Sequence, residues 1–253
     1  MLGRRVFRKD TLVVFVVMLT FLAGCTISGG SRSEPLQEAS PHKFGWWVGP
    51  RGNDSAIDIG FHGKGVQIEI VRSYLSHTRI DSPVGKRWTH NYLMHIRNTS
   101  DRRIQLFDGK GQNTVFTKTE SGTLSTGDEK DSRLIKSDGE GLHKFLDEAG
   151  TMFEFSRKGR LTHIQGNQYG NKISLAYGAD GYLESISDAE GNIITFYYDQ
   201  ETHRIRTIRD GRGRSVSYEH DSVGNLVSVT NANGITSKYS YDRQSRLVGV
   251  TFP

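Results

Sequence analysis

Hydrophobic positions in the C-terminal part of the chain recur in short units. Each unit opens on an aliphatic residue that is followed three positions later by another, as in Leu183 and Ile186. A turn glycine comes next, and a ring stands seven residues after it. The openers, glycines and rings are Leu161, Leu183, Ile205, Leu226 and Leu247; Gly170, Gly191, Gly213 and Gly234; and Tyr177, Tyr198, His220 and Tyr241. The openers are spaced by 22, 22, 21 and 21 residues, which predicts a repeat architecture.

The second half of each unit alternates as a half-buried strand does. Residues three, five and seven positions after the glycine, such as Ile194, Phe196 and Tyr198, share one face under a period of two. The first half fits a flat strand less well, because aliphatic residues three apart point to opposite faces. Either both faces are partly covered or the strand contains a bulge. A lone hairpin cannot bury its apolar face, so the units are expected to pair into a growing sheet.

The segment from Gly181 to Asp199 reads GYLESISDAEGNIITFYYD. It resembles the YD repeat of the RHS family, whose pattern is roughly G-x-L-x-x-I-x-D-x-x-G-N-x-x-x-x-x-Y-D. The resemblance implies an all-β fold in which YD-repeat hairpins stack into a curved antiparallel sheet, part of an RHS β-shell. Departures from the pattern, where slightly altered turns are expected, stand at Gly178, Arg214, His220 and Ile235.

Residues 44–103 are expected to form a β domain of their own. The alternating segments 56–61 and 66–74 read as a hairpin, and a turn at Ser82 to Gly85 precedes a strand that begins around Trp88 and includes Tyr92 and Met94. This stretch resembles the domain that precedes the YD repeats in RHS proteins. The match is carried by Arg72, Tyr74, Ser76, Ser82, Pro83, Gly85, Trp88 and Tyr92. The resemblance implies a piece that starts or plugs the shell, and we interpret Arg72 and the aromatic residues as structural anchors rather than a ligand cage.

Residues 104–158 read as degenerate repeats, and 159–253 as regular ones. The spacing of five from turn glycine to aromatic ring persists in the degenerate part, as in Gly150 and Phe155, whereas 117–141 is polar and predicts an exposed loop. The last strand pair of the regular repeats is apolar and predicts an open sheet edge. A partner chain or further RHS repeats are expected to pair there.

The first 24 residues read as a bacterial signal peptide. Four basic residues precede an apolar run of 12 residues from Thr11 to Leu22, which is too short to span a membrane as a mature helix. The tetrapeptide Leu22, Ala23, Gly24 and Cys25 resembles a lipobox, which implies that Cys25, the sole cysteine, carries the lipid. Residues 25–43 then form a flexible tether. Thr26 is not the aspartate that signals inner-membrane retention, so an outer-membrane or cell-surface location is expected; the twin-arginine export route stays open beside the general secretory one.

Composition and motifs exclude several classes of function. The formal charge is +5, but the first 24 residues contribute +3 of it, so a nucleic-acid partner has little support. No metal-protease, serine-hydrolase or phosphate-loop motif occurs. The nine histidines are scattered; His90 and His95 are the nearest pair, and on one strand they would face opposite sides. We therefore predict no enzyme activity, no metal site and no cofactor.

Two functions remain open at this stage. The first is a non-enzymatic, lipid-anchored cell-envelope protein that forms the N-terminal part of a split or truncated RHS shell. In relatives of that kind, many units coil around a C-terminal toxin or effector. The alternative is a surface adhesion module that binds carbohydrate or protein through tyrosines, arginines and asparagines on a β face.

Overall fold

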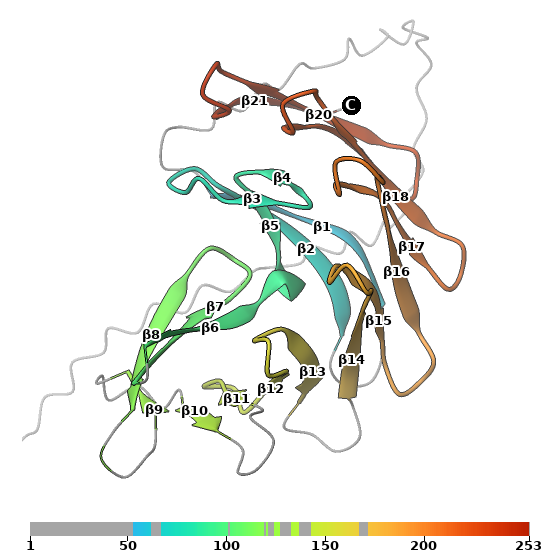
Figure 1. The fold of residues 1–253 in the computed structure, drawn as a ribbon. Helices are drawn as coiled ribbons and strands as arrows, with labels where there is room; N and C mark the ends of the chain where they lie inside the picture. Colours follow the sequence, from blue (N-terminus) through green and yellow to red (C-terminus); the bar gives the residue numbers. More distant parts are fainter. Residues whose placement is uncertain are drawn as a thin grey trace, which may run out of the picture. The chain divides into compact units, whose positions relative to one another are not determined.

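The computed structural model describes residues 53–61, 67–100, 102–118, 120, 124–126, 133–136, 143–166 and 172–252 (Figure 1). The chain divides into two compact units, 1–40 and 41–253, and all described residues lie in the second. The signal peptide, the lipobox around Cys25, the tether and Gly170 lie outside the described residues and stay predictions.

Twenty-one short strands and one 3₁₀-helix, η1, make up the described part of the chain. Their bounds are β1 Asn53–Phe61, β2 Ile68–Leu75, β3 Asp81–Ser82, β4 Gly85–Lys86, β5 Trp88–His90, η1 Asn91–Leu93, β6 His95–Ser100, β7 Arg103–Phe107, β8 Asn113–Lys118, β9 Leu124–Ser125, β10 Arg133–Lys136, β11 His143–Leu146, β12 Met152–Phe155, β13 Leu161–Gln165, β14 Lys172–Tyr177, β15 Leu183–Ser187, β16 Ile193–Tyr198, β17 Ile205–Asp210, β18 Ser215–His220, β19 Leu226–Thr230, β20 Thr236–Tyr241 and β21 Leu247–Thr251.

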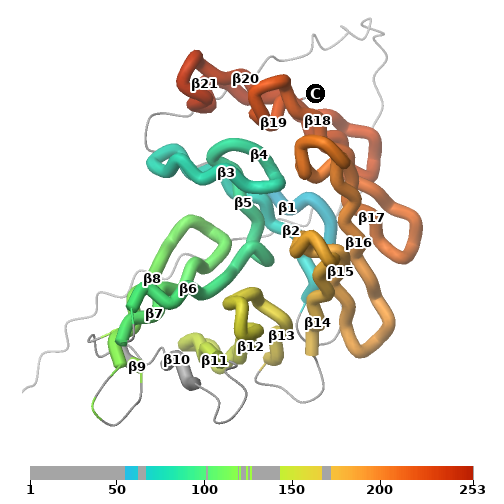
Figure 2. The backbone as a smooth tube through the Cα atoms, viewed as in Figure 1, coloured from blue at the N-terminus to red at the C-terminus, as the bar shows by residue number. Residues whose placement is uncertain are grey.

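Every strand from β6 to β21 pairs antiparallel with its neighbour in sequence, which makes one meandering sheet of sixteen strands in the described residues. The path folds back and forth along the chain in Figure 2. A second sheet has the order β1-β2-β5, and β3 and β4 form a separate small hairpin. The predicted all-β fold of stacked hairpins is confirmed. The repeat sheet already begins at β6, upstream of the boundary expected at residues 103 and 104.

A bulge explains the spacing of three between the aliphatic residues of each opener strand. Leu183 pairs with Tyr177 and Ser185 pairs with Ala176, so Glu184 is the extra residue. The bulge returns Ile186 to the face of Leu183, and the two side chains are 0% and 3% exposed. The same register shift recurs at the start of β13, β17, β19 and β21. Of the two readings left open by the sequence, the bulge is therefore right.

An acidic or amide side chain organises most of the turns between strands. Asp188 Oδ1 accepts hydrogen bonds from the amides of Glu190 and Asn192, and Asp188 Oδ2 accepts one from Asn192 Nδ2 at 2.8 Å. Arg214 takes the place of that asparagine and donates from Nε to Asp210 Oδ2 at 2.6 Å. Most of the turns are closed by a backbone hydrogen bond from the amide of the fourth residue to the carbonyl oxygen of the first. This bond is also present from Gly181 N to Gly178 O and from Gly234 N to Asn231 O, just before Ile235. The backbone of these turns is therefore regular, and the alterations expected at Gly178, Arg214 and Ile235 lie in the side-chain hydrogen bonds.

The segment expected as a long exposed loop is partly strand. Residues 117–141 contain the end of β8 and the short strands β9 and β10, which continue the sheet toward β11. Leu124 is 4% exposed and joins the hydrophobic core. The polar composition of the segment concealed these short strands. The other degenerate units follow the glycine spacing, with Phe116 and Phe155 both fully buried.

The turn at Gly159 packs against another strand through its backbone. Gly159 has φ of 79°, and its carbonyl oxygen accepts a hydrogen bond from Ile96 N at 2.8 Å. A Cβ at this position would collide with the Ile96 carbonyl oxygen, whereas a Cβ at Gly213, with φ of 86°, would meet nothing within 4 Å.

Replacing Gly159 with alanine is expected to cost clearly more stability than replacing Gly213. Both substitutions force alanine into the left-handed region, which costs about 1–2 kcal/mol. Gly159→Ala adds the displacement of two backbone segments, which typically costs a further ~1–3 kcal/mol. Urea unfolding of the two variants measures the difference, and equal losses would show that the turn does not pack on β6.

The helix η1 interrupts the strand that was expected to run from Trp88 through Met94. His90 is its N-cap and accepts a hydrogen bond from Tyr92 N through Nδ1 at 3.2 Å. The His90 ring is 2% exposed and stacks on Phe196 with centroids 5.6 Å apart. Because η1 separates them, His90 and His95 belong to different sheets rather than to one strand.

The buried His90 predicts an acid-dependent loss of stability. Burial lowers the pKa of His90 to about 3, whereas the histidine of the unfolded chain keeps its ordinary pKa of about 6.5. Between these two values the unfolded chain binds one proton more than the folded chain. The contribution of His90 to stability falls by about 1.4 kcal/mol per pH unit as the pH drops from about 6 to 4. His90→Asn keeps an N-capping acceptor and removes the titration. Urea unfolding between pH 4 and 7 should give that variant a slope smaller by about one proton, and an unchanged slope would contradict the assignment.

Candidate functional site at the interface of the two sheets

A buried ion pair lies between the three-stranded sheet and the repeats. Arg72 on β2 donates from Nη2 to Asp58 Oδ1 at 3.0 Å, and each side chain is 4% exposed. Asp58 also accepts from the hydroxyl of Tyr218 at 2.6 Å, and Arg72 Nη1 donates to the hydroxyl of Tyr239 at 2.8 Å. Burial lowers the pKa of Arg72, but the carboxylate of Asp58 outweighs it and the pKa is raised. This pair of the three-stranded sheet thus has hydrogen-bond partners in the repeat sheet.

Aromatic rings surround this ion pair. Trp88 packs edge-to-face against Tyr74 and Tyr239, with centroids 5.2 Å away in each case. The Arg72 guanidinium lies 4.9 Å from the Trp88 ring centroid. Trp88 Nε1 donates to the hydroxyl of Tyr241 at 2.8 Å. The Tyr74 hydroxyl accepts from the amide of Leu247 at 2.8 Å. The polar atom of each of these rings thus has a partner across the interface.

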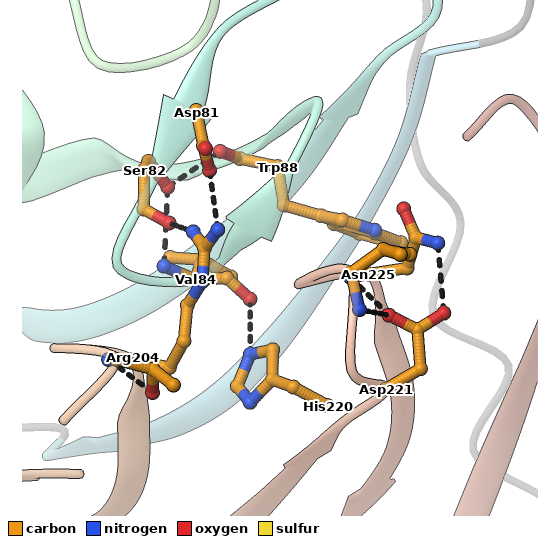
Figure 3. A network of polar contacts seen from close by, with 10 residues as sticks. Asp81, Ser82, Val84, Trp88, Arg204, His220, Asp221 and Asn225 are labelled. Carbon is orange, nitrogen blue, oxygen red and sulfur yellow. Dashed lines mark hydrogen bonds and ion pairs between the residues drawn. The ribbon is translucent and has the colours of Figure 1, made fainter. Parts of the chain in front are cut away.

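The hairpin of β3 and β4 docks beside this cluster on β17 and β18 and on the turn before β19 (Figure 3). Pro83 O accepts from Ile205 N at 2.8 Å, and Val84 O contacts His220 Nε2 at 2.9 Å. Lys86 N donates to Gly224 O at 3.1 Å. Arg204 donates to Ser82 O and pairs with Asp81 at 2.6 Å. Backbone groups of the hairpin carry most of these contacts.

The departure at His220 is explained by this docking. In the other units the tyrosine hydroxyl donates to the carbonyl of the preceding opener: Tyr177 to Leu161 and Tyr198 to Leu183 at 2.7 Å, and Tyr241 to Leu226 at 2.6 Å. His220 instead reaches the hairpin carbonyl of Val84. The shorter ring leaves room for the hairpin. A break in the repeat pattern is therefore the signal that marked this contact in the sequence.

The repeat residues singled out in the sequence form the core and turns of the sheet. Leu161, Leu183, Ile205, Leu226 and Leu247 are at most 5% exposed, and the turn glycines Gly191, Gly213 and Gly234 have positive φ. Tyr177, Tyr198 and Tyr241 are half-buried.

The structure brings Arg72, Tyr74, Pro83, Gly85 and Trp88 together at the interface. Gly85, with φ of 139°, packs against Leu226. Tyr92 does not join them. It lies in η1 and is 3% exposed among other core residues, where burial raises its pKa to about 12.

Sequence reasoning missed Asp58 as the partner of Arg72. Ile57 pairs with Val71 and Ile59 with Ile70, so Asp58 is the extra residue of a bulge in β1. The bulge turns the carboxylate inward, although simple alternation would place Asp58 opposite the buried Ile59. No signal in the sequence distinguishes this aspartate from an exposed one.

The side chains of this interface hold the two sheets together. Its charges are paired and its rings are packed, and in the described ranges no three His, Cys, Asp or Glu side chains converge as metal ligands. Nor does any helix in the described part have the length and hydrophobicity to cross a membrane.

Two family models match parts of this chain. Residues 53–116 match the family model "Domain of unknown function (DUF6531)", and residues 220–253 match the model "RHS Repeat". Teneurin-4 of Mus musculus is 27% identical over 130 residues, which cover 49% of this chain and 5% of teneurin-4.

Two solved structures are similar at low sequence identity. A crystal structure of TcdB2-TccC3-Cdc42 aligns with 80% of this chain and 12% of that chain, at 13% identity and a TM-score of 0.35. A structure of the Photorhabdus luminescens Tc holotoxin pore aligns with 78% of this chain and 13% of that chain, at 14% identity and a TM-score of 0.34. The chain thus spans a small fraction of the length of each relative.

Proposed function

We propose that this RHS/YD-repeat protein is a non-enzymatic, lipid-anchored cell-envelope protein whose repeat sheet is one part of an RHS shell. Further repeats, on a partner chain or in a longer form of the protein, extend the sheet at β21. The three-stranded sheet and the β3–β4 hairpin fasten the repeats from within, as anchors rather than as a catalytic site.

The observation that carries this proposal is the edge strand β21. Within the described residues β21 pairs with β20 alone, so its outer N–H and C=O groups face no strand, apart from the Leu247 amide, which donates to the Tyr74 hydroxyl of β2. Val248 is 45% exposed and Phe252 is 47% exposed. An apolar edge strand that lacks a charge or proline is a template for strand addition. Hydrogen bonds from Arg72 to Tyr239 and from Trp88 to Tyr241 already hold β20 in place beside β21.

Blocking this edge tests the proposal. Val248→Lys places a charge on the edge, and Val223→Lys makes the same change at an exposed turn valine that is 56% exposed. Native complexes from the source membranes are sized for each variant, and their components are identified by mass spectrometry. The proposal expects either a longer chain that itself contains further YD repeats, or a complex with such repeats that is lost in Val248→Lys alone. A monomer without further YD repeats in the wild type and in both variants would refute shell extension.

The lipid anchor has a test of its own. The intact mass of the native protein should include diacylglycerol on Cys25 and lack residues 1–24. Cys25→Ser should release the protein from the membrane fraction. Retention of the unmodified N-terminus in wild-type protein would remove the anchor from the proposal and leave the shell untouched.

A tyrosine-lined cavity favours surface adhesion as the second candidate function. A cavity of about 320 Å³ is bordered by Tyr92, Tyr177, Tyr182 and Tyr198, with Arg160 beside them. Tyr182 packs against Tyr198 with centroids 5.3 Å apart and stacks on His203 with centroids 5.1 Å apart, so its ring is held in place at the cavity, where a sugar could pack against the tyrosines. On a glycan array, binding that disappears in Tyr182→Ala and persists in Tyr197→Ala would support adhesion.

A further inference from the structure

A separate basic cavity lies where a turn of the repeats crosses β6. Its volume is about 310 Å³, and its lining includes His95, Arg97, Asn98, His143, Arg157 and Lys158. Three of these side chains are permanent cations and two are imidazoles, and no carboxylate lines the cavity. We propose that this cavity binds a phosphate-type oxyanion.

The backbone fixes the cations that form this cavity. Gly159 N donates to Ser156 O at 2.8 Å and closes the turn that carries Arg157 and Lys158. Ile96 N donates to Gly159 O at 2.8 Å, and His95 forms an isolated bridge with Arg160. These bonds hold the turn against β6, so its basic residues are placed beside Arg97 by the fold rather than by flexible side chains.

The charges of the turn are unusual for this sheet. Most turns have two central residues between the first residue and the glycine, and these central residues vary along the chain. Examples are Ala189 and Glu190, and Ser222 and Val223. Among the turns in the described ranges, the one that closes on Gly159 alone has two basic residues there. In the same ranges no salt bridge engages Arg97 or Lys158.

Complementary chemistry selects the ligand. Arginine presents a planar fork that suits the oxygens of a phosphate, and lysine adds a point charge. Arg97 also lies over the Phe107 ring, at 5.7 Å from its centroid, which restrains the guanidinium at the cavity rim. An oxyanion that bridges β6 and the turn would neutralise cations that the fold otherwise keeps close together.

Binding of inorganic phosphate to the full chain tests the proposal. Calorimetry at constant ionic strength, with chloride as the competing ion, should show saturable binding of phosphate or sulfate. Arg97→Gln combined with Lys158→Gln should weaken it by about tenfold, as expected for the loss of hydrogen bonds to a charged group. The control combines Arg243→Gln with Lys238→Gln, which removes the same charge from an equivalent exposed turn and strand and should leave binding unchanged.

Vesicles distinguish the two sources of such an oxyanion. If phosphatidylglycerol vesicles compete with phosphate and phosphatidylcholine vesicles do not, the natural ligand is an anionic lipid headgroup. If neither competes, the ligand is a soluble or polymer-borne phosphate. Absence of saturable phosphate and sulfate binding, or equal weakening in the control variant, would overturn the proposal. Neither result depends on shell extension at β21.

Discussion

Replacing Arg72 with methionine is expected to lower the free energy of unfolding by about 3–5 kcal/mol. The substitution leaves the Asp58 carboxylate buried without its cation, in a position that is 4% exposed. It also removes the donor to Tyr239 and the cation over the Trp88 ring. The loss therefore combines an uncompensated buried charge with a broken contact between the sheets.

An exposed arginine of the repeats provides the matched control. Arg246 pairs with Asp242 at 2.6 Å, but its side chain is 60% exposed. Because water solvates both groups of such a pair, Arg246→Met should leave urea unfolding almost unchanged. A double variant, Arg72→Met with Asp58→Leu, should recover part of the stability, since no unpaired charge remains. A loss below about 1 kcal/mol for Arg72→Met alone would show that water reaches the pair.

Replacing Trp88 with alanine should cost about 3–5 kcal/mol as well. Trp88 is 1% exposed, and its ring lies between Tyr74 and Tyr239, so truncation opens a cavity at the centre of the interface. Trp88→Phe keeps most of the ring surface and loses the hydrogen bond to Tyr241, for which a smaller loss of ~1–2 kcal/mol is expected.

Tyr197→Ala serves as the surface control for this experiment, because that ring is 47% exposed. Urea unfolding followed by tyrosine fluorescence should rank the variants with Trp88→Ala as the least stable and Tyr197→Ala close to wild type. If Trp88→Ala and Tyr197→Ala were equally stable, the packing of the two sheets through Trp88 would be refuted.

Periodicity predicted the repeat sheet well because each unit encodes its own structure. The turn acceptor, the glycine and the alternating strand are all within about 20 residues, and pairing with the next unit follows from sequence order. The bulge was visible as an anomaly, the spacing of three between Leu183 and Ile186, although the sequence did not choose between two explanations.

The interface was only partly predictable, because its contacts join distant parts of the chain. Arg72, Tyr74 and Trp88 stood out by resemblance to a known domain, yet their partners Asp58, Tyr218 and Tyr239 did not. Asp58 faces inward through a bulge that nothing in the local pattern requires. The polar stretch 117–141 misled in the opposite direction: it was expected to be an exposed loop, yet Leu124 is buried and β9 and β10 continue the sheet.

Because the chain is synthesised from its N-terminus, the contacts of Arg72 and Tyr74 with the repeats form late. Arg72 bonds to a tyrosine 167 residues later in the chain, and Tyr74 bonds to an amide 173 residues later, whereas the hairpins of the meander close over a few residues each. Local hairpins form quickly, but contacts of such separation wait until the distant strand exists. A nascent chain must therefore hold the pair of Arg72 and Asp58 without its tyrosine partners until β18 and β20 emerge. Proteases should cut the N-terminal sheet readily before that moment and slowly after it.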